Sequence, residues 1–141
     1  MVKVFSRSGI RLQYPGNWTL EADDSSEGWA VTILSKDTAF LVVTLVVDSD
    51  DPAQVAQETV DALKKEYENL EVENAIETIA HLPAIGFDTE FMLFDLVNVA
   101  WIRCLNAPEG CLLFLAQCTD EEMETNGEVL KAIIASVTIE D

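Results

Sequence analysis

Basic side chains are scarce in this sequence. Its 141 residues include 8 lysines and arginines against 26 aspartates and glutamates, which gives a formal net charge of −18. Such a chain is repelled by nucleic acid and by an anionic bilayer, because both are bound through basic side chains. We therefore expect no nucleic-acid partner and no membrane partner. Basic proteins, cations or simple solubility remain as reasons for the charge.

Long apolar runs are also missing. No stretch approaches the roughly 20 apolar residues that a membrane-spanning helix needs. The start, MVKVFSRSGIRLQYPG, lacks the apolar core of about 7–15 residues that defines a secretory signal. If Met1 is the natural start, these absences predict a cytoplasmic protein.

Cysteine is sparse and irregularly spaced. Cys104, Cys111 and Cys118 are odd in number and lack C-x-x-C spacing, which argues against a disulfide framework or a structural zinc site. All three lie in apolar, strand-like sequence, so we expect buried free thiols in a reducing compartment. A bridge between Cys104 and Cys111 across a tight turn stays open as the alternative.

Recognisable catalytic motifs are absent. The sequence contains no G-x-S-x-G, no G-x-x-x-x-G-K and no G-x-G-x-x-G. Its only histidine, His81, has no acid or cysteine at a suggestive spacing, so we expect a solvated turn residue. Asp48–Asp51 is similar to the start of a calcium loop, but Pro52 takes the fifth position and Thr59 the place of the final glutamate. The sequence therefore predicts no catalytic residue, no metal site and no cofactor.

Apolar residues are what the chain does have. They make up 49% of it, enough for a real core in one domain over residues 1–141. Gly, Pro, Asn and Asp clusters divide the chain into strand candidates. These candidates are 2–6, 10–14, 18–22, 29–36, 39–47, 70–80, 84–94, 98–106 and 111–118. We expect a polar loop at 23–28 and a break at 81–83.

One of these strands carries a dense row of acids. In 70–80 the residues Leu70, Val72, Ile76 and Thr78 alternate with Glu71, Glu73 and Glu77. This pattern predicts a strand with one buried face and one acidic face. Acids at this density are typical of a sheet edge, because they discourage a second molecule from adding to it.

The first helix is predicted at about 52–67. Asp51 is suited to cap it, Pro52 fits the first helical position, and Gln54 can complete a capping box. Apolar residues then recur at helical spacing as far as Tyr67. One apolar stripe predicts one covered face.

The second helix is predicted at about 120–136. Thr119 and Glu122 have capping-box spacing, and three acids stand in the expected first turn. Gly127 is costly inside a helix, so we expect either a close approach to the sheet or a break at Asn126-Gly127.

Most of the strands follow one another without a helix between them, which predicts hairpins and an antiparallel sheet. Strands such as 39–47 are apolar on both sides and need cover on both sides. The predicted fold class is therefore α+β, an α/β/α sandwich. It has a central, mainly antiparallel sheet of six or more strands and two principal helices, one on each face.

The order of these signals resembles the PsbP/Mog superfamily. The carrying features are Tyr14–Trp18 (YPGNW), the step Pro83-Ala84, the three-strand meander after it, and a closing helix ending near Ala135–Val137. That superfamily includes the photosystem subunit PsbP, the Ran-release factor Mog, DcrB-like bacterial domains and chaperones of type VI secretion effectors. The resemblance covers nearly the whole chain and implies the same sandwich and a role in docking on other proteins. Bacterial relatives often carry glycine where this chain has His81.

The segment FMLFDLVNVAWI, Phe91–Ile102, combines ten apolar residues with Asp95 and Asn98. We interpret it as parts of two central strands with a turn at Phe94–Asn98. Hairpin tips usually carry glycine, asparagine or aspartate, so apolar residues here predict an exposed contact surface. Its expected members are Phe94, Leu96, Val97 and Trp101. The alternatives are a tip covered by a loop, or one continuous strand.

These observations predict a non-enzymatic protein-binding module, an adaptor or chaperone-like domain that docks through sheet-end loops and the apolar tip. Its partner is expected to be another protein, with a homodimer left open. The alternative is a small-molecule binder or an enzyme with an unrecognised site between sheet and helix. In that case Cys104 or Cys118 with His81 would be the reactive set.

Overall fold

The computed structural model describes residues 1–140. Its strands are β1 (Val2–Arg7), β2 (Ile10–Pro15), β3 (Thr19–Ser25), β4 (Gly28–Leu34), β5 (Phe40–Val47), β6 (Glu71–Ile79), β7 (Leu82–Leu93), β8 (Leu96–Ala107), β9 (Gly110–Thr119) and β10 (Thr138–Ile139). Its helices are α1 (Pro52–Glu66), the 3₁₀ helix η1 (Asp120–Glu122) and α2 (Asn126–Ala135).

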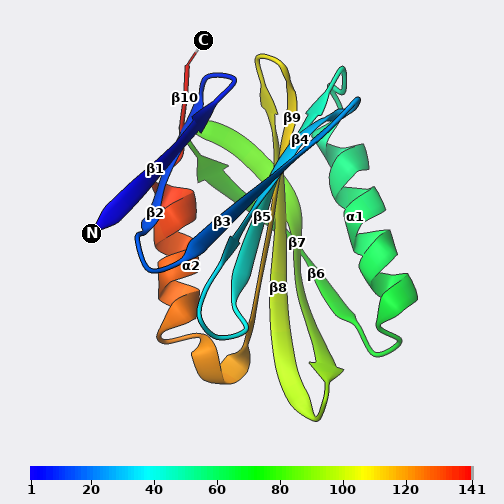
Figure 1. Cartoon of the computed structure of the whole chain (residues 1–141). Coiled ribbons are helices and arrows are strands. Elements are labelled where there is room, and N and C mark those ends of the chain that lie inside the picture. Colours follow the sequence, from blue (N-terminus) through cyan, green and yellow to red (C-terminus); the bar gives the residue numbers. More distant parts are fainter. Residues whose placement is uncertain (141) are drawn as a thin grey trace.

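The strands form two sheets. Within residues 1–140 the long sheet has seven strands in the order β3-β4-β5-β9-β8-β7-β6, and every neighbouring pair is antiparallel. This confirms the predicted central antiparallel sheet. The first two strands pair with β10 instead, in a separate sheet of order β1-β2-β10 (Figure 1). The sequence pattern did not indicate that separation.

The two principal helices lie on opposite faces of the long sheet (Figure 1). Ala56 and Val60 of α1 pack on Ile102, Cys104 and Cys111 of β8 and β9. On the other face, the buried cluster joins α2 and the small sheet to β4, β5 and β9. Its members include Ile10, Leu12, Trp29, Val43, Phe114, Leu130 and Ile133. The prediction of one helix on each face is confirmed.

Helix α1 begins as the sequence predicts, with Pro52 in its first turn. The carboxylate of Asp51 accepts a hydrogen bond from the backbone N–H of Gln54 at 3.1 Å, which caps one free donor. The Gln54 side chain donates to Glu58 at 3.1 Å and does not return to the cap. Only half of the predicted capping box is therefore formed.

The second helix is shorter than predicted. Thr119 and Glu122 form the capping box, but on η1, and α2 starts only at Asn126. The Glu122 carboxylate also accepts hydrogen bonds from Thr38 and from the backbone N–H of Ala39, which tie this turn to the β4–β5 loop.

Gly127 allows the closing helix to pack tightly after this break. A Cβ atom there would lie 3.2 Å from the Met123 Sδ and 3.7 Å from the Cys118 Sγ. Both alternatives for Gly127 therefore hold in part, since it stands at the helix start and in close contact with the sheet.

Two local expectations need correction. The predicted polar loop 23–28 is mostly strand, because β3 runs to Ser25 and only Ser26 and Glu27 turn. Backbone pairing with β4 holds these residues while their charged side chains project into water. The predicted break at 81–83 lies one residue earlier, at Ala80 and His81. Pro83 is within β7, where β8 pairing has not yet begun and the missing N–H costs no inter-strand bond to β8.

The predicted buried face of residues 70–80 is only partly covered. Val72 is half-buried, but Ile76 is 80% exposed and Thr78 is also exposed. Helix α1 packs on β7, β8 and β9. It therefore leaves most of the outermost strand, β6, uncovered. The prediction that this strand is a sheet edge is confirmed.

Within residues 1–140, no helix has both the length and the apolar character needed to cross a membrane.

Candidate binding cleft

A cleft of about 1060 Å³ separates α2 from the β6–β8 half of the long sheet. It exists because α2 and the small sheet lie over the other half of that face, above β4, β5 and β9. Strands β6 and β7 extend past this cover. One half of this face of the long sheet is therefore covered, and the other half is accessible to solvent.

The floor of the cleft comes from β8. Alternate residues of a strand share a face, so Val97, Val99, Trp101 and Arg103 all point to the α2 side. Trp101 is half-buried and lines the cleft together with Val99. The other tryptophans are in the core, since Trp18 is 6% and Trp29 4% exposed. Trp101 therefore offers a large, partly open apolar surface.

One wall of the cleft is acidic. Glu71 on β6 stands opposite Glu90 on β7, and Glu73 stands opposite Asp88. Asp88 is in turn opposite Trp101 on β8, and Glu90 is opposite Val99. Each row across the sheet thus passes from two acids on β6 and β7 to an apolar residue on β8.

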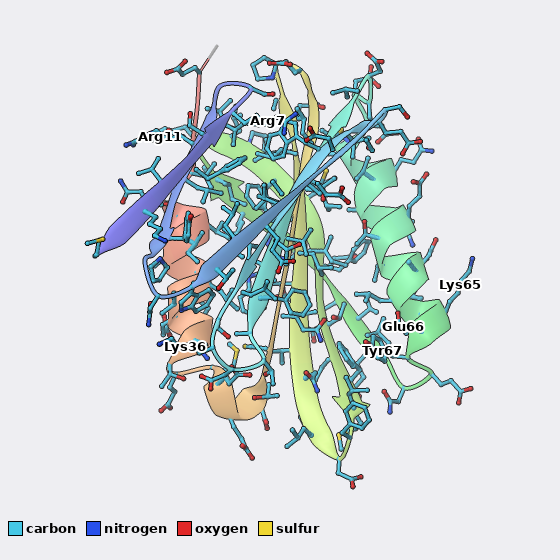
Figure 2. All side chains as sticks on the ribbon, in the orientation of Figure 1. Arg7, Arg11, Lys36, Lys65, Glu66 and Tyr67 are labelled. Carbon is cyan, nitrogen blue, oxygen red and sulfur yellow. The ribbon has the colours of Figure 1, made fainter. Side chains whose placement is uncertain are left out.

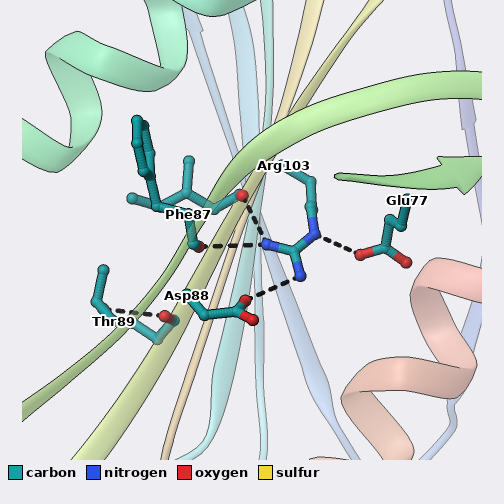
Figure 3. A network of polar contacts seen from close by, with 7 residues as sticks. Glu77, Phe87, Asp88, Thr89 and Arg103 are labelled. Carbon is teal, nitrogen blue, oxygen red and sulfur yellow. Dashed lines mark hydrogen bonds and ion pairs between the residues drawn. The ribbon is translucent and has the colours of Figure 1, made fainter. Parts of the chain in front are cut away.

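Arg103 pairs with two acids of this wall, Glu77 and Asp88 (Figure 3). Its side chain is only 10% exposed, with Nε 2.5 Å from Glu77 Oε1 and Nη2 2.9 Å from Asp88 Oδ1. Nη1 donates to the carbonyl oxygens of Ile102 at 3.0 Å and Phe87 at 3.2 Å. The guanidinium is therefore held in place by four polar partners, and the carboxylates of Glu77 and Asp88 balance its charge.

The opposite wall is mostly apolar. It comes from Met123, from Ile134 and Ala135 of α2, and from the chain end at Val137–Ile139. Lys131 is the cation of this wall, and its Nζ lies 4.0 Å from Glu128 Oε1. The walls therefore differ in character, acidic on the sheet and apolar on the helix.

The predicted apolar tip is present and exposed. Phe94 and Asp95 form the two-residue turn between β7 and β8, with φ of 52° and 61°. Bulky residues rarely adopt this left-handed conformation, and hairpins usually place Asn-Gly there. Phe94 is nevertheless 89% exposed. The sequence keeps an apolar side chain at a position that suits another residue better.

The base of this hairpin is firmly anchored. Tyr67 lies at the end of α1 (Figure 2). Its ring stacks on Phe91, with ring centroids 4.0 Å apart. The backbone N–H of Met92 donates to Asn69 Oδ1 at 3.2 Å. The tip therefore projects from a fixed support.

The structure divides the four predicted contact residues. Val97 and Trp101 share the cleft face, and Phe94 stands at the tip. Leu96 is 38% exposed and pairs with Leu93 on the other face. The strip of Val97, Val99 and Trp101 thus runs from the tip into the cleft.

The residues suggested for chemistry are not brought together. His81 is in the β6–β7 turn at the rim of the cleft, with φ of 65°. Cys104 is buried under α1 on the opposite face of the sheet. Cys118 is buried on the α2 face, with Sγ 3.4 Å from Met123 Sδ. His81, Cys104 and Cys118 therefore lie in three separate places and do not form a reactive set.

Burial also makes these thiols unreactive. It is the main cause that raises the pKa of Cys104 to about 12 and the pKa of Cys118 to about 11. Cys104, Cys111 and Cys118 are all free and buried. In residues 1–140 no group of three or more His, Cys, Asp or Glu residues is arranged to hold a metal ion.

Sequence reasoning missed the cleft. It identified the acids of β6 and the tryptophan of β8 separately, and it missed Asp88, Glu90 and Lys131. The sequence does contain a sign of this acidic face. Glu71 and Glu73 have the same two-residue spacing as Asp88 and Glu90 on the next strand. Pairing the two strands about a turn at Ala80 and His81 would have put these acids on one face.

Similarity to known proteins is limited to structure. No protein-family model and no curated protein matches this chain. LpqN of Mycobacterium tuberculosis, described as involved in cell envelope biogenesis, is 18% identical, with a TM-score of 0.66 over 100% of this chain and 91% of LpqN. CyanoP, the PsbP of Synechocystis sp. PCC 6803, is 11% identical, with a TM-score of 0.71 over 99% of this chain and 92% of CyanoP.

A third structure extends this group. PA94 of Pseudomonas aeruginosa, a protein of unknown function, is 9% identical, with a TM-score of 0.58 over 99% of this chain and 98% of PA94. At these identities the matches establish the fold alone. The chain has the PsbP-like fold, as its resemblance predicted. The closer likeness to Mog and DcrB-like domains stays a prediction.

Proposed function

We propose, from the PsbP-like fold and the cleft beside α2, that this chain is a non-enzymatic protein-binding module. It would hold a segment of another protein against Trp101, with the β7–β8 tip as a second contact. The observation that carries the proposal is a half-buried tryptophan on the floor of an open cleft. Tryptophan in a partly enclosed apolar site is a frequent centre of protein–protein binding energy.

The shape of the cleft favours a chain segment over a small molecule. Its volume of about 1060 Å³ is slightly larger than that of most small-molecule sites, which usually measure about 300–1,000 Å³ and enclose most of the ligand. Its floor also continues as an apolar strip toward Phe94. An elongated occupant can use both regions at once.

The compartment we propose is the cytoplasm. Three free buried cysteines fit a reducing environment. An adaptor or chaperone-like role there agrees with the docking function that the family resemblance implies.

The proposal can be tested by peptide selection on the purified full chain. Random peptides of about 16 residues would be displayed and selected on the wild type, and their affinities measured by isothermal titration calorimetry. We expect Trp101→Ala to weaken the selected peptides by roughly tenfold or more, the scale of an interface hot spot. The matched control is Ile76→Ala, because Ile76 is 80% exposed on the other face of the sheet.

Folding must be checked in parallel, since Trp101 also packs against the core. Trp101→Phe keeps an aromatic ring and should retain most of the binding. Selected peptides that bind wild type and Trp101→Ala equally, with both proteins folded, would contradict the proposal. Failure to recover any peptide would contradict it too.

A further inference from the structure

The charged residues that line the cleft indicate which kind of segment it can bind. Taking the proposed function as given, we infer that the bound segment is cationic and amphipathic, with basic side chains along one side and apolar side chains along the other.

The acids of the cleft exceed its cations. Its lining includes five carboxylates against Arg103 and Lys131, a formal balance of −3. The carboxylates are Glu71, Glu73, Glu77, Asp88 and Glu90. Arg103 is committed to Glu77 and Asp88. Within residues 1–140, Glu71, Glu73 and Glu90 take part in no ion pair.

The register makes this arrangement costly for the free protein. Glu71 is directly opposite Glu90, and Glu73 is directly opposite Asp88. Like charges directly opposite one another in an antiparallel pair are destabilising. Arg103 already balances the charge of Asp88, so the repulsion is greatest between Glu71 and Glu90. A positive side chain of the occupant placed over Glu71 and Glu90 would reduce this repulsion and also be attracted to both carboxylates.

The same register sets where the occupant's charges lie. The two rows Glu71-Glu90-Val99 and Glu73-Asp88-Trp101 are two residues apart, or about 7 Å along the strands. Neighbouring strands are about 5 Å apart, so the acids and the apolar strip lie within the width of one chain segment. A segment running along β7 would therefore place basic side chains over β6 and β7 and apolar ones over β8.

The charge also disfavours a second copy of this chain in the cleft. Its formal net charge of −18 makes an approach to three unpaired carboxylates repulsive. Anionic lipid is disfavoured for the same reason. A basic segment of a different protein is the occupant with complementary charge.

Defined probes test this inference. Fluorescein-labelled peptides of about 12 residues, long enough to run along β7, would share one apolar face and carry either lysine or glutamine on the other face. Fluorescence anisotropy would give their affinities. We expect the lysine peptide to bind roughly tenfold more tightly at about 50 mM salt, and this advantage to shrink at about 300 mM because salt screens exposed charges.

A matched pair of triple variants separates the cleft from overall charge. Glu71→Gln with Glu73→Gln and Glu90→Gln should abolish the lysine advantage. The control, Glu21→Gln with Asp23→Asn and Glu68→Gln, removes the same three charges from exposed sites outside the cleft and should retain it. Equal loss in both triple variants, or a glutamine peptide that binds as well as the lysine peptide, would overturn the inference.

Other occupants are distinguished in the same assays. Neutral peptides that still require Trp101 would overturn the cationic segment but leave the proposed function standing. Spermine that binds as tightly as the lysine peptide, without needing Trp101, would overturn a peptide occupant. A dimer seen in sedimentation velocity and lost in Trp101→Ala would identify a second copy and overturn the inference.

Discussion

Glu71 and Glu90 stand directly opposite each other on β6 and β7, on the face that lines the cleft. No cation of residues 1–140 lies within ion-pair distance of either carboxylate. The pair is a local conflict between stability and charge placement, and conflicts of this kind concentrate at binding sites.

Reversing one of these charges should stabilise the protein. We expect Glu90→Lys to raise the free energy of unfolding by about 0.5–1 kcal/mol, because a cross-strand repulsion becomes an attraction. Urea unfolding at low salt measures this change. Glu68→Lys, at an exposed loop position, makes the same charge change and should have a smaller effect. A lower stability for Glu90→Lys would mean that the pair is not repulsive.

Removing Arg103 should have the opposite effect. Arg103→Ala leaves Glu77 and Asp88 unpaired and two carbonyl oxygens without their donor. We expect a loss of about 3 kcal/mol in the free energy of unfolding. Arg103→Lys should recover little of it, since an ammonium cannot reproduce the guanidinium geometry. Arg11→Ala at an exposed site is the control, expected to change stability by less than about 0.5 kcal/mol.

Glu122 should make stability dependent on pH. Burial by itself raises its pKa, but hydrogen bonds from Thr38, Asn126 and Thr119 outweigh burial and hold the pKa below its usual value. A lowered pKa contributes stability above the unfolded-state value, near 4.5, and that contribution is lost as the pH falls through the folded-state value.

The variant Glu122→Gln tests this dependence. It should lower the free energy of unfolding by about 1 kcal/mol at neutral pH. The difference from wild type should shrink as the pH falls below the unfolded-state pKa of 4.5. Urea unfolding at several pH values gives the comparison. Glu124→Gln removes an exposed carboxylate nearby and should show no such trend. A difference that grows toward low pH would contradict the assigned role.

The hairpin tip should be more stable with ordinary turn residues. Replacing Phe94 with Asn and Asp95 with Gly puts residues that favour the left-handed conformation at both turn positions. We expect a gain of about 1 kcal/mol in the free energy of unfolding. The same double variant should weaken binding of selected peptides if the tip is a contact. Thermal unfolding and calorimetry measure the two effects. An unchanged affinity would remove the tip from the binding surface.

The buried cysteines should be unreactive toward thiol reagents in the folded protein. With pKa values of about 12 and about 11, Cys104 and Cys118 carry almost no thiolate at pH 8. We expect Ellman's reagent to label neither thiol at an appreciable rate in the native state and all three cysteines in urea. Rapid native labelling of Cys104 would show that α1 opens from the sheet.

Local signals predicted most of the elements. Asp51 and Pro52 mark the start of α1 because capping depends on neighbouring residues alone. The alternation of β6 predicts an edge strand for a similar reason. The start of α2 was misplaced. The turn before it contains Glu122, which bonds to Thr38 and Ala39, more than eighty residues away in the chain, and neighbouring residues do not indicate such contacts.

Predicting the cleft would have required the register between strands, which local signals do not give. Whether Glu71 meets Glu90 depends on the register of β6 and β7, and that register depends on a two-residue turn at Ala80 and His81. A shift of one residue in either strand would pair each acid with a residue of the other face.

The sequence by itself determined the parts: two capped helices, an antiparallel set of strands, an acidic edge and an apolar hairpin tip. Each follows from residues within a few positions of one another, where propensity, capping and alternation act. Only the tertiary structure decided that α2 and the small sheet cover half of one sheet face and leave Trp101 beside three unpaired carboxylates. That arrangement follows from how far each covering layer reaches across the sheet, a distance set by packing between segments remote in the chain.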